Sequence, residues 1–161
     1  MSEVLFPPQF EPSRGPLFTH NELLIEAPRE QVWAWLVRAS RWPEWYGNCR
    51  DLRFDRATPG PDLTHGSRFD WITFGFRVRT VIEEFIPGER LAWSGVATGG
   101  RGYHGWVLEP RGAKRCRVVT EEVQRGLVPT VGGFILRRQL LAWHQRWLEG
   151  LAQRAATGLP S

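Results

Sequence analysis

The chain has 161 residues and a mass of 18.5 kDa, enough for one domain with a buried core and too short for two. An apolar content of 42% and a charged content of 24% are near the averages of globular proteins, and no apolar run approaches the roughly 20 residues of a bilayer-spanning helix, so neither a disordered chain nor a membrane-spanning helix is indicated. The net charge of +4 comes from arginines spread along the chain without a dense block, which argues against a nucleic-acid-binding protein.

The N-terminal segment, residues 1–16, contains four prolines, which remove backbone donors and favour extended chain. We therefore expect a proline-rich arm that is not a packed element; the alternative is that Leu5 and Phe6 pin it to the body of the protein or to a neighbouring subunit. The segment lacks the basic stretch and the following apolar run of a secretory signal peptide, so a cytoplasmic location is the default expectation.

A strand and a short helix are predicted next. Residues 17–26, LFTHNELLIE, alternate imperfectly between apolar and polar side chains, as a strand does. A proline then suits the first turn of a helix, where its missing N–H costs nothing. The helix PREQVWAWLV is expected to bury Val32, Leu36 and either Trp33 or Trp35.

A second helical turn and a run of strands follow. Ser40 or Trp42, followed by Pro43, is expected to begin the turn, and Gly47 to end it. Six short segments rich in β-branched and aromatic residues then alternate with turn signals, which predicts an antiparallel meander. These segments are CRDLRFD, SRFDWITF, FRVRTVIEEFI, ERLAWSGVA, GYHGWVLEP and KRCRVVTEEV.

The last predicted element is a long amphipathic helix, VGGFILRRQLLAWHQRWLEGLAQRAA, which opens at Gly132 and Gly133. Only this helix is large enough to cover the apolar face of a seven-stranded sheet, which predicts an α+β fold. Because such a sheet twists around the helix, the two surfaces need not touch everywhere, and a cavity can form between them. The apolar stripe of the helix is Leu136, Leu140, Trp143, Trp147 and Leu151.

Six motifs carry a resemblance to a known family, and they are IEAPREQVW, RWPEW, HGSRFDW, IPGERLAWSG, YHGWVLEP and CRVVTEEVQRG. Over about residues 17–156 the chain resembles the START and Bet v 1-like (SRPBCC) superfamily, in particular its polyketide cyclase/dehydrase-like branch. The resemblance implies the helix-grip fold: a seven-stranded antiparallel sheet wrapped around a long C-terminal helix, with two short helices after the first strand. We therefore expect residues 17–157 to form a single ligand-binding domain.

The resemblance also implies a deep, mostly apolar pocket for a hydrophobic or aromatic small molecule. Some members of the superfamily are cyclases or dehydratases, and others only bind or transport a ligand. The shared motifs concern the fold, and no catalytic residue set can be carried over from them by position.

One pair of polar residues is predicted to face the cavity. The last two strand segments flank one turn and should pair as a hairpin, and if Leu108 lies opposite Val118, then His104 lies opposite Glu122 on the same apolar face. A carboxylate beside an imidazole orients the ring and suits acid–base chemistry on a carbonyl or enol. A one-residue slip would pair His104 with Glu121 instead. The alternative is that His104 is an ordinary strand residue with a satisfied hydrogen bond.

Aromatic side chains dominate the remaining candidates for the pocket, since facing tryptophan rings are hard to pack without gaps. The alternative is that most of the nine tryptophans fill the core. Trp42 and Trp45, which flank Pro43, are the first candidates for a ligand-contacting ring, and His144 is either a cavity residue or a buried histidine bonded to a neighbour. The full predicted lining is Trp42, Trp45, Trp71, Trp93, Trp106, Val118, Thr120, Leu140, Trp143, His144 and Trp147.

Several other polar residues are expected to face solvent. Arg77 and Arg79 alternate with apolar neighbours and are expected in an exposed ion network, with a buried anion-binding arginine as the alternative. Tyr103 points away from the face of His104 and is expected on the outside. His20 and His65 stand in polar or turn contexts and are expected to be solvated.

Other kinds of site lack support in the sequence. The glycine pair at the start of the last helix lacks the lysine and hydroxyl of a P-loop and suggests a flexible entrance or a kink. The sequence has no GxSxG motif and no cluster with metal-ligand spacing, so we expect neither a metal nor another cofactor. Cys49 and Cys116 are far apart and are expected to be buried thiols.

The preferred interpretation is a single-domain protein that binds a hydrophobic, aromatic or polyketide-like small molecule in an internal cavity as a carrier. The first alternative is a cyclase or dehydratase that uses His104 and Glu122 as an acid–base pair. The second is a protein-interaction adaptor, which would show a closed or absent cavity and exposed tryptophans. The expected partner is the small molecule, without nucleic acid or integral membrane contact, and the protein is expected to be a monomer or homodimer.

Overall fold

The computed structural model describes residues 2–161 and contains one seven-stranded antiparallel sheet, as the sequence predicts. The strand order is β1-β7-β6-β5-β4-β3-β2, so the meander from β2 to β7 is continuous and β1 joins it beside β7. The strands are β1 (Leu17–Ile25), β2 (Arg50–Phe54), β3 (Arg68–Thr73), β4 (Phe76–Ile86), β5 (Arg90–Ala97), β6 (Gly100–Pro110) and β7 (Cys116–Arg125).

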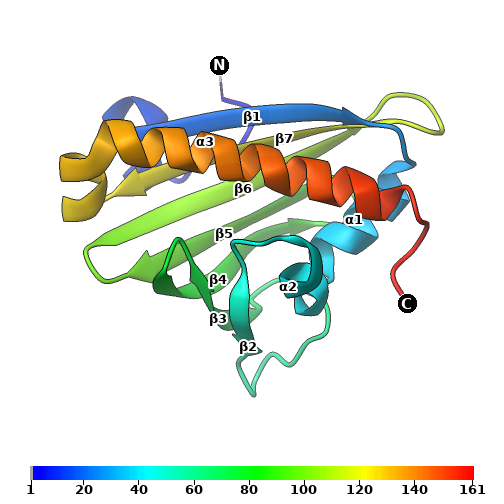
Figure 1. Ribbon diagram of the computed structural model, residues 1–161, viewed down its shortest axis with the longest axis horizontal. Coiled ribbons are helices and arrows are strands. Elements are labelled where there is room, and N and C mark those ends of the chain that lie inside the picture. The colour runs from blue at the N-terminus through cyan, green and yellow to red at the C-terminus, as the bar shows by residue number, and fades with distance from the viewer. Residues whose placement is uncertain (1) are drawn as a thin grey trace.

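The helices cover one face of this sheet (Figure 1). The short helices α1 (Arg29–Val37) and α2 (Trp42–Trp45) follow β1 and lie at the end of the sheet near the C-terminus. The long helix α3 (Leu127–Ala155) runs across the same face. This arrangement is the helix-grip fold, and it confirms the predicted α+β class. The three short 3₁₀ helices are η1 (Pro8–Phe10), η2 (Pro12–Arg14) and η3 (Ala39–Arg41).

Helix α3 begins earlier than the sequence analysis placed it. Its first residue is Leu127, so Gly132 and Gly133 lie inside the helix and do not open it. Gly126 makes the turn from β7 with a positive φ of 121°, a conformation that favours glycine. Pro129 is accommodated in the first helical turn because an N–H at that position has no intrahelical partner.

The main core lies between the inner face of the sheet and the helices, and Trp42 is at its centre. The Trp42 side chain is fully buried, and its indole N–H donates a hydrogen bond of 3.0 Å to the carbonyl of Leu36. Its ring centroid lies 5.1 Å from that of Trp147 in α3 and 5.7 Å from that of Trp93 in β5. One indole therefore joins α2, α3 and the sheet. On α1 the buried side chains include Val32, Trp35 and Leu36, so Trp35 and not Trp33 is the more deeply packed of the two candidates.

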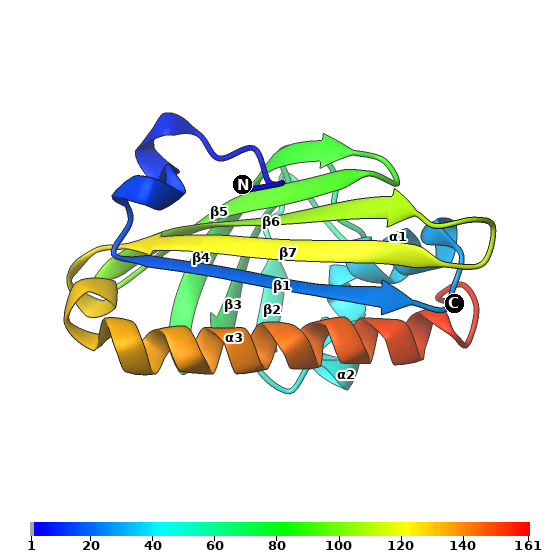
Figure 2. The same ribbon diagram turned by 90° about the horizontal axis from the view of Figure 1, so that it is seen from above.

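Residues 2–16 of the arm pack on the sheet, so the expectation of an unpacked arm is wrong, whereas Phe6 contacts the body of the domain as the alternative stated and Leu5 is exposed. The arm crosses the face of the sheet that lies away from α3 (Figure 2) and forms a second small core with it. Val4 and Phe10 are buried there, and the ring of Phe10 lies 5.7 Å from that of Tyr103. Tyr103 is thus on the predicted outer face of β6, but the arm covers it. Proline removes backbone donors, but it does not prevent the apolar side chains of the arm from packing on the sheet.

A buried carboxylate fixes the start of the arm. Glu121 of β7 is 1% exposed, and its Oε2 accepts hydrogen bonds from the backbone N–H groups of Glu3 and Val4 at 3.1 and 3.0 Å. Its Oε1 lies 2.8 Å from Nδ1 of His20, whose ring is partly exposed as expected. The charge on Glu121 is therefore satisfied by hydrogen bonds on both oxygens.

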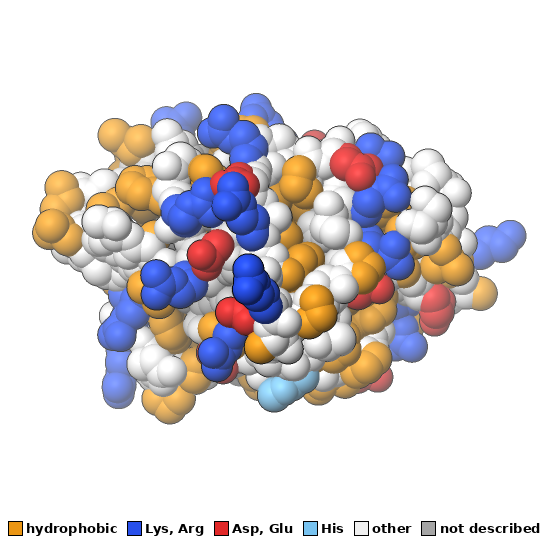
Figure 3. Space-filling view, turned by 90° about the horizontal axis from the view of Figure 1, so that it is seen from below, with side chains coloured by type: hydrophobic (Ala, Val, Ile, Leu, Met, Phe, Trp, Pro, Cys, Tyr) orange, Lys and Arg blue, Asp and Glu red, His pale blue; other side chains and the backbone are white. Residues whose placement is uncertain are grey.

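The expectations about the surface and the thiols hold. Arg77 and Arg79 are exposed, and Arg77 pairs with Asp51. On the face shown in Figure 3, basic side chains are interspersed with acidic and hydrophobic ones and form no continuous basic stripe. Cys49 and Cys116 are buried free thiols, and burial raises the pKa of Cys49 to about 12. Within residues 2–161, no helix is long and apolar enough to cross a membrane.

The position of Trp42 predicts a large effect of truncation. Trp42→Ala should lower the free energy of unfolding by about 3–5 kcal/mol, because it leaves a cavity where three layers of structure meet. Urea denaturation followed by circular dichroism measures this. Trp33→Ala, on a half-buried ring of α1, is the control and should cost clearly less. Equal losses in the two variants would contradict the central role of Trp42.

The packing of the arm predicts an effect at Gly105. A Cβ at this glycine would lie 2.3 Å from Cγ1 of Val4, so Gly105→Ala should displace the arm and cost about 1–3 kcal/mol. The same substitution at Gly132, where a Cβ meets no atom within 4 Å, should instead stabilise helix α3 by about 0.5–1 kcal/mol. Thermal unfolding shows whether Gly105→Ala lowers the stability and Gly132→Ala raises it. Limited proteolysis shows whether the arm is released. A stable Gly105→Ala variant with a protected arm would disprove the packing argument.

Candidate functional site

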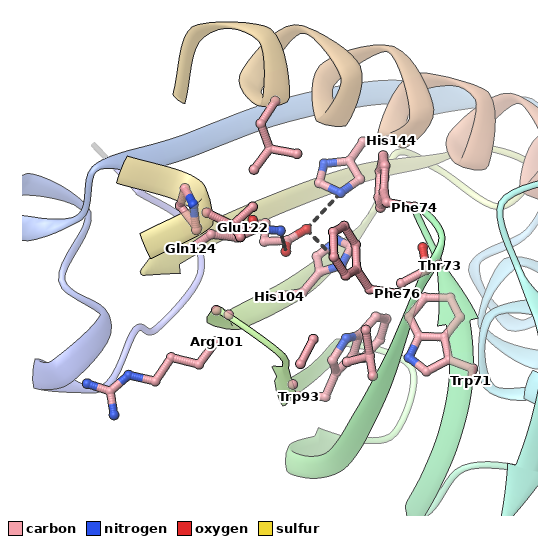
Figure 4. Close-up of a pocket in the computed structure, with 18 of the residues that line it drawn as sticks. Trp71, Thr73, Phe74, Phe76, Trp93, Arg101, His104, Glu122, Gln124 and His144 are labelled. Carbon is pink, nitrogen blue, oxygen red and sulfur yellow. Dashed lines mark hydrogen bonds and ion pairs between the residues drawn. The ribbon is translucent and has the colours of Figure 1, made fainter. Parts of the chain in front are cut away.

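A cavity of about 120 Å³ lies between the sheet and the N-terminal half of α3, and it is partly open to the surface. Its walls come from the β3–β4 hairpin, from β5, β6 and β7, from α3 and from Tyr46 at the end of α2. The twist of the sheet brings these elements together at the end away from α1, and Figure 4 shows their side chains converging. Most of the wall is apolar, and the aromatic side chains that form it are Tyr46, Trp71, Phe74, Phe76, Trp93 and Trp147.

Three ionisable side chains from three elements meet in the wall of this cavity (Figure 4). His104 is on β6, Glu122 is opposite it on β7, and His144 is on α3. The Oε2 atom of Glu122 lies 2.9 Å from Nε2 of His144 and 3.6 Å from Nδ1 of His104. Both imidazoles therefore converge on one carboxylate oxygen. We call these three residues the His–Glu–His cluster.

The register of the β6–β7 hairpin is the one that the apolar pattern favours. Leu108 pairs with Val118 and His104 pairs with Glu122, so the slipped alternative with Glu121 is excluded. Side chains alternate along a strand, and for this reason Glu122 faces the cavity while Glu121 faces the arm on the opposite side of the sheet.

Further hydrogen bonds hold each member of the cluster in place. Nε2 of His104 lies 2.6 Å from Oγ1 of Thr120, and the Thr120 hydroxyl donates to the carbonyl of Gly105 at 3.2 Å. Since the hydroxyl has one proton, His104 is the donor to Thr120, and a neutral ring then has its lone pair on Nδ1, which faces Glu122. The 3.6 Å between Nδ1 of His104 and Oε2 of Glu122 is too long for a hydrogen bond.

The outer contacts of Glu122 and His144 complete the network. Oε1 of Glu122 accepts a hydrogen bond of 2.7 Å from the side-chain amide of Gln124. Nδ1 of His144 lies 3.4 Å from the hydroxyl of Thr19, which can either donate or accept. In the neutral ring of His144, the proton on Nε2 is donated to Glu122, and the Thr19 hydroxyl donates to Nδ1.

Burial and neighbouring charges set the ionisation of the cluster. Desolvation, together with the nearby His144, lowers the pKa of His104 to about 3, although Glu122 acts in the opposite direction, so His104 is a neutral imidazole at physiological pH. Burial alone would raise the pKa of Glu122, but the hydrogen bond from His144 and the attraction of both imidazoles outweigh it and hold the pKa below its usual value. The cavity wall thus contains a carboxylate that is buried and charged.

The structure divides the predicted pocket residues into two groups. The group that lines the cavity is Trp71, Trp93, His104, Glu122, His144 and Trp147. The group that does not line it, contrary to the expectation, is Trp42, Trp45, Trp106, Val118, Thr120, Leu140 and Trp143.

Packing explains why the second group lies outside the lining. Trp42 is enclosed by other aromatic rings, and Trp45 packs against Gly150 of α3. Thr120 lies behind His104 and orients it. The others are similarly packed: Trp106, Val118 and Leu140 are buried in the protein, and the half-buried ring of Trp143 contacts Tyr46 and Arg146.

Part of the lining was not anticipated from the sequence. The tip of the β3–β4 hairpin contributes Thr73, Phe74 and Phe76, and the first turn of α3 contributes Val128 and Pro129. No local pattern shows that these segments meet. Gln124 could have been found, because it lies two residues from Glu122 and therefore on the same face of β7. The His–Glu–His cluster escaped a search for metal-ligand spacing because its members are 18 and 22 residues apart in sequence.

The fold and the site together define a helix-grip protein with an internal, largely aromatic cavity. Residues 20–160 match the family described as polyketide cyclase / dehydrase and lipid transport. The chain belongs to this family, which confirms the resemblance found in its motifs. No curated protein matches the chain in sequence.

Solved structures with the same fold include three informative examples. A hypothetical protein from Helicobacter pylori is 29% identical, with a TM-score of 0.87 over 96% of this chain and 97% of that one. The Zhui aromatase/cyclase from Streptomyces sp. R1128 is 14% identical, with a TM-score of 0.70 over 89% and 98% of the two chains. Norcoclaurine synthase from Thalictrum flavum, in complex with dopamine and hydroxybenzaldehyde, is 11% identical, with a TM-score of 0.67 over 89% and 88%. The last two similarities concern the fold alone.

From the contact between Glu122 and His144 we predict that a single substitution destabilises the protein and that a second substitution partly restores its stability. His144→Leu should lower the free energy of unfolding by about 3 kcal/mol or more, because it removes a hydrogen bond from a buried carboxylate. Adding Glu122→Met should restore much of this loss, since an apolar pair needs no compensation. Urea denaturation of the single and double variants measures the difference. If the double variant is less stable than the single one, the carboxylate is not the source of the cost.

Proposed function

We propose that the protein binds a small aromatic or otherwise hydrophobic molecule in this cavity as a carrier, with the polar group of the ligand directed at the His–Glu–His cluster. The observation that supports this most strongly is the cavity itself, which has largely aromatic walls and a few polar groups, among them the His–Glu–His cluster. Apolar walls with a few placed polar groups are typical of small-molecule sites. Membership of a family described by polyketide chemistry and lipid transport agrees with such a ligand.

The size of the cavity limits the ligand. A volume of about 120 Å³ is below the roughly 300–1,000 Å³ of sites for drug-sized molecules. A ligand of one or two rings therefore suits the cavity better than a long polyketide. The hydroxybenzaldehyde named in the norcoclaurine synthase structure is a ligand of this size.

Two polar atoms in the cavity wall support an oriented ligand. Oγ1 of Thr73 and the indole N–H of Trp147 are buried and have no hydrogen-bond partner among the described residues 2–161. Buried polar groups normally have a partner, so a ligand oxygen that bonds to either atom would be stabilised. Both atoms thus favour a ligand with a hydroxyl or carbonyl group.

Acid–base catalysis is the second candidate, as in a cyclase or dehydratase. It is favoured by the pairing of His104 with Glu122, because the free lone pair on Nδ1 of His104 is placed to accept a proton beside the cavity. If a ligand is converted, His104→Gln should abolish the conversion while ligand binding persists. Unchanged conversion in this variant would exclude the acid–base role.

The adaptor alternative has little support. It predicts a closed or absent cavity and exposed tryptophans, whereas the protein has a cavity and each of its nine tryptophans is buried or half-buried. The cytoplasmic location and the monomeric or homodimeric state remain predictions.

Blocking the cavity should abolish ligand binding. Ala97 lines the cavity, and Ala97→Phe would add an aromatic ring within it, so the affinity for 4-hydroxybenzaldehyde should fall at least tenfold. Quenching of the tryptophan fluorescence reports binding, because Trp71 and Trp93 lie in the wall. The matched control is Ala57→Phe in an exposed turn, which should bind as the unmodified protein does.

Ligand size is tested in the same titration. The four-ring hydrocarbon pyrene should not compete with 4-hydroxybenzaldehyde for the unmodified protein, because the cavity is too small for it. If pyrene binds more tightly than 4-hydroxybenzaldehyde, or if Ala97→Phe and Ala57→Phe bind the ligand equally, the ligand does not bind in this cavity.

A further inference from the structure

We propose that His104, Glu122 and His144 form a binding site for a divalent first-row transition metal ion such as Zn²⁺, with one coordination position directed into the cavity. Two imidazoles and one carboxylate are a ligand set that such ions accept readily. The inference goes beyond ligand binding by the apolar walls, because the metal alone would occupy the site.

The distances in the His–Glu–His cluster fit a metal centre. Metal–ligand bonds of about 2.0–2.1 Å in tetrahedral geometry place the ligand atoms about 3.3 Å apart. In the protein, Oε2 of Glu122 is 2.9 Å from Nε2 of His144 and 3.6 Å from Nδ1 of His104, and all the ligand atoms lie within 4.8 Å of one another. Small side-chain movements would therefore bring the three atoms around one ion.

The hydrogen bonds behind the cluster leave the correct atoms free. The Nε2–H of His104 is donated to Thr120, so the lone pair on Nδ1 faces the cluster. Oε1 of Glu122 is occupied by Gln124, so Oε2 alone is left for the ion. Metal-binding histidines typically donate their other N–H to a second group in this way.

His144 can adapt to the ion without losing a contact. Its Nε2 donates to Glu122 when no ion is bound, and binding requires that the proton move to Nδ1. The hydroxyl of Thr19, 3.4 Å from Nδ1, can then act as the acceptor instead of the donor.

Without an ion, the cluster contains an unfavourable contact. The lone pair of His104 Nδ1 and the carboxylate of Glu122 face each other with no proton between them, and the two side chains are only 6% and 12% exposed. A cation between the two acceptors removes this repulsion and compensates the buried negative charge. An arrangement of hydrogen bonds alone explains the contact between Glu122 and His144, but it leaves the contact with His104 unexplained.

The experiment is a titration of the chelator-treated 161-residue protein with Zn²⁺ by calorimetry, and with Co²⁺ by visible absorption. We expect one ion per chain and the absorption bands of Co²⁺ coordinated by nitrogen and oxygen. Glu122→Gln, which keeps the shape of the side chain, should weaken Zn²⁺ binding more than 100-fold. Thr120→Val, which removes the partner of His104, should weaken it by about 10–100-fold.

The matched control is His20→Ala. His20 lies beside Glu22 and Glu121 near the surface, where a second ion could bind adventitiously, and its removal should leave the one-to-one binding unchanged. Near-ultraviolet circular dichroism of the buried tryptophans shows that each variant is folded. No binding, or binding that persists in folded Glu122→Gln and is lost in His20→Ala, would overturn the proposal. Because Zn²⁺ is tested alone, a failure of aromatic ligand binding is distinguished from a failure of the metal site.

Discussion

The structure depends on the contact between α3 and the inner face of the sheet, and Trp147 is at the centre of that contact. Its ring stacks on Tyr46 at 4.2 Å and meets Trp106 edge-on at 5.0 Å. A single helix must cover the apolar face of seven strands, and large flat rings fill this layer incompletely. Where the rings meet closely the protein has a core, and where α3 diverges from the twisted sheet it has a cavity.

Side chains alternate between the two faces of the sheet along β7, so the adjacent residues Glu121 and Glu122 lie on opposite faces and make different contacts. Glu121 points to the outer face, where it holds the start of the N-terminal arm by backbone hydrogen bonds. Glu122 points to the inner face, where it meets His144 of α3. Each carboxylate is buried, and each joins the sheet to a segment that is distant in sequence. One strand thus organises both layers that pack on the sheet.

Burying the polar His–Glu–His cluster in an aromatic core costs free energy of folding, which points to a role other than stability. A buried carboxylate with two imidazoles is not required for folding, since apolar side chains would fill the same space without compensation. The additional contacts with Thr19, Thr120 and Gln124 keep the three groups directed at one point. A ligand, an ion or a transferred proton at that point gives the arrangement a use that packing alone does not provide.

The sequence by itself determined the order of the elements, the α+β class and the pairing of His104 with Glu122. These follow from local periodicity and from short turns, which act between residues close along the chain. The helix-grip fold was implied by the resemblance that the sequence motifs carry. Only the tertiary structure decided that His144 joins this pair, that Trp42 lies behind the cavity wall, and that the proline-rich arm is packed. These outcomes depend on where α3 and the arm meet the sheet, and such long-range contacts are set by the packing of whole surfaces, which no local pattern encodes.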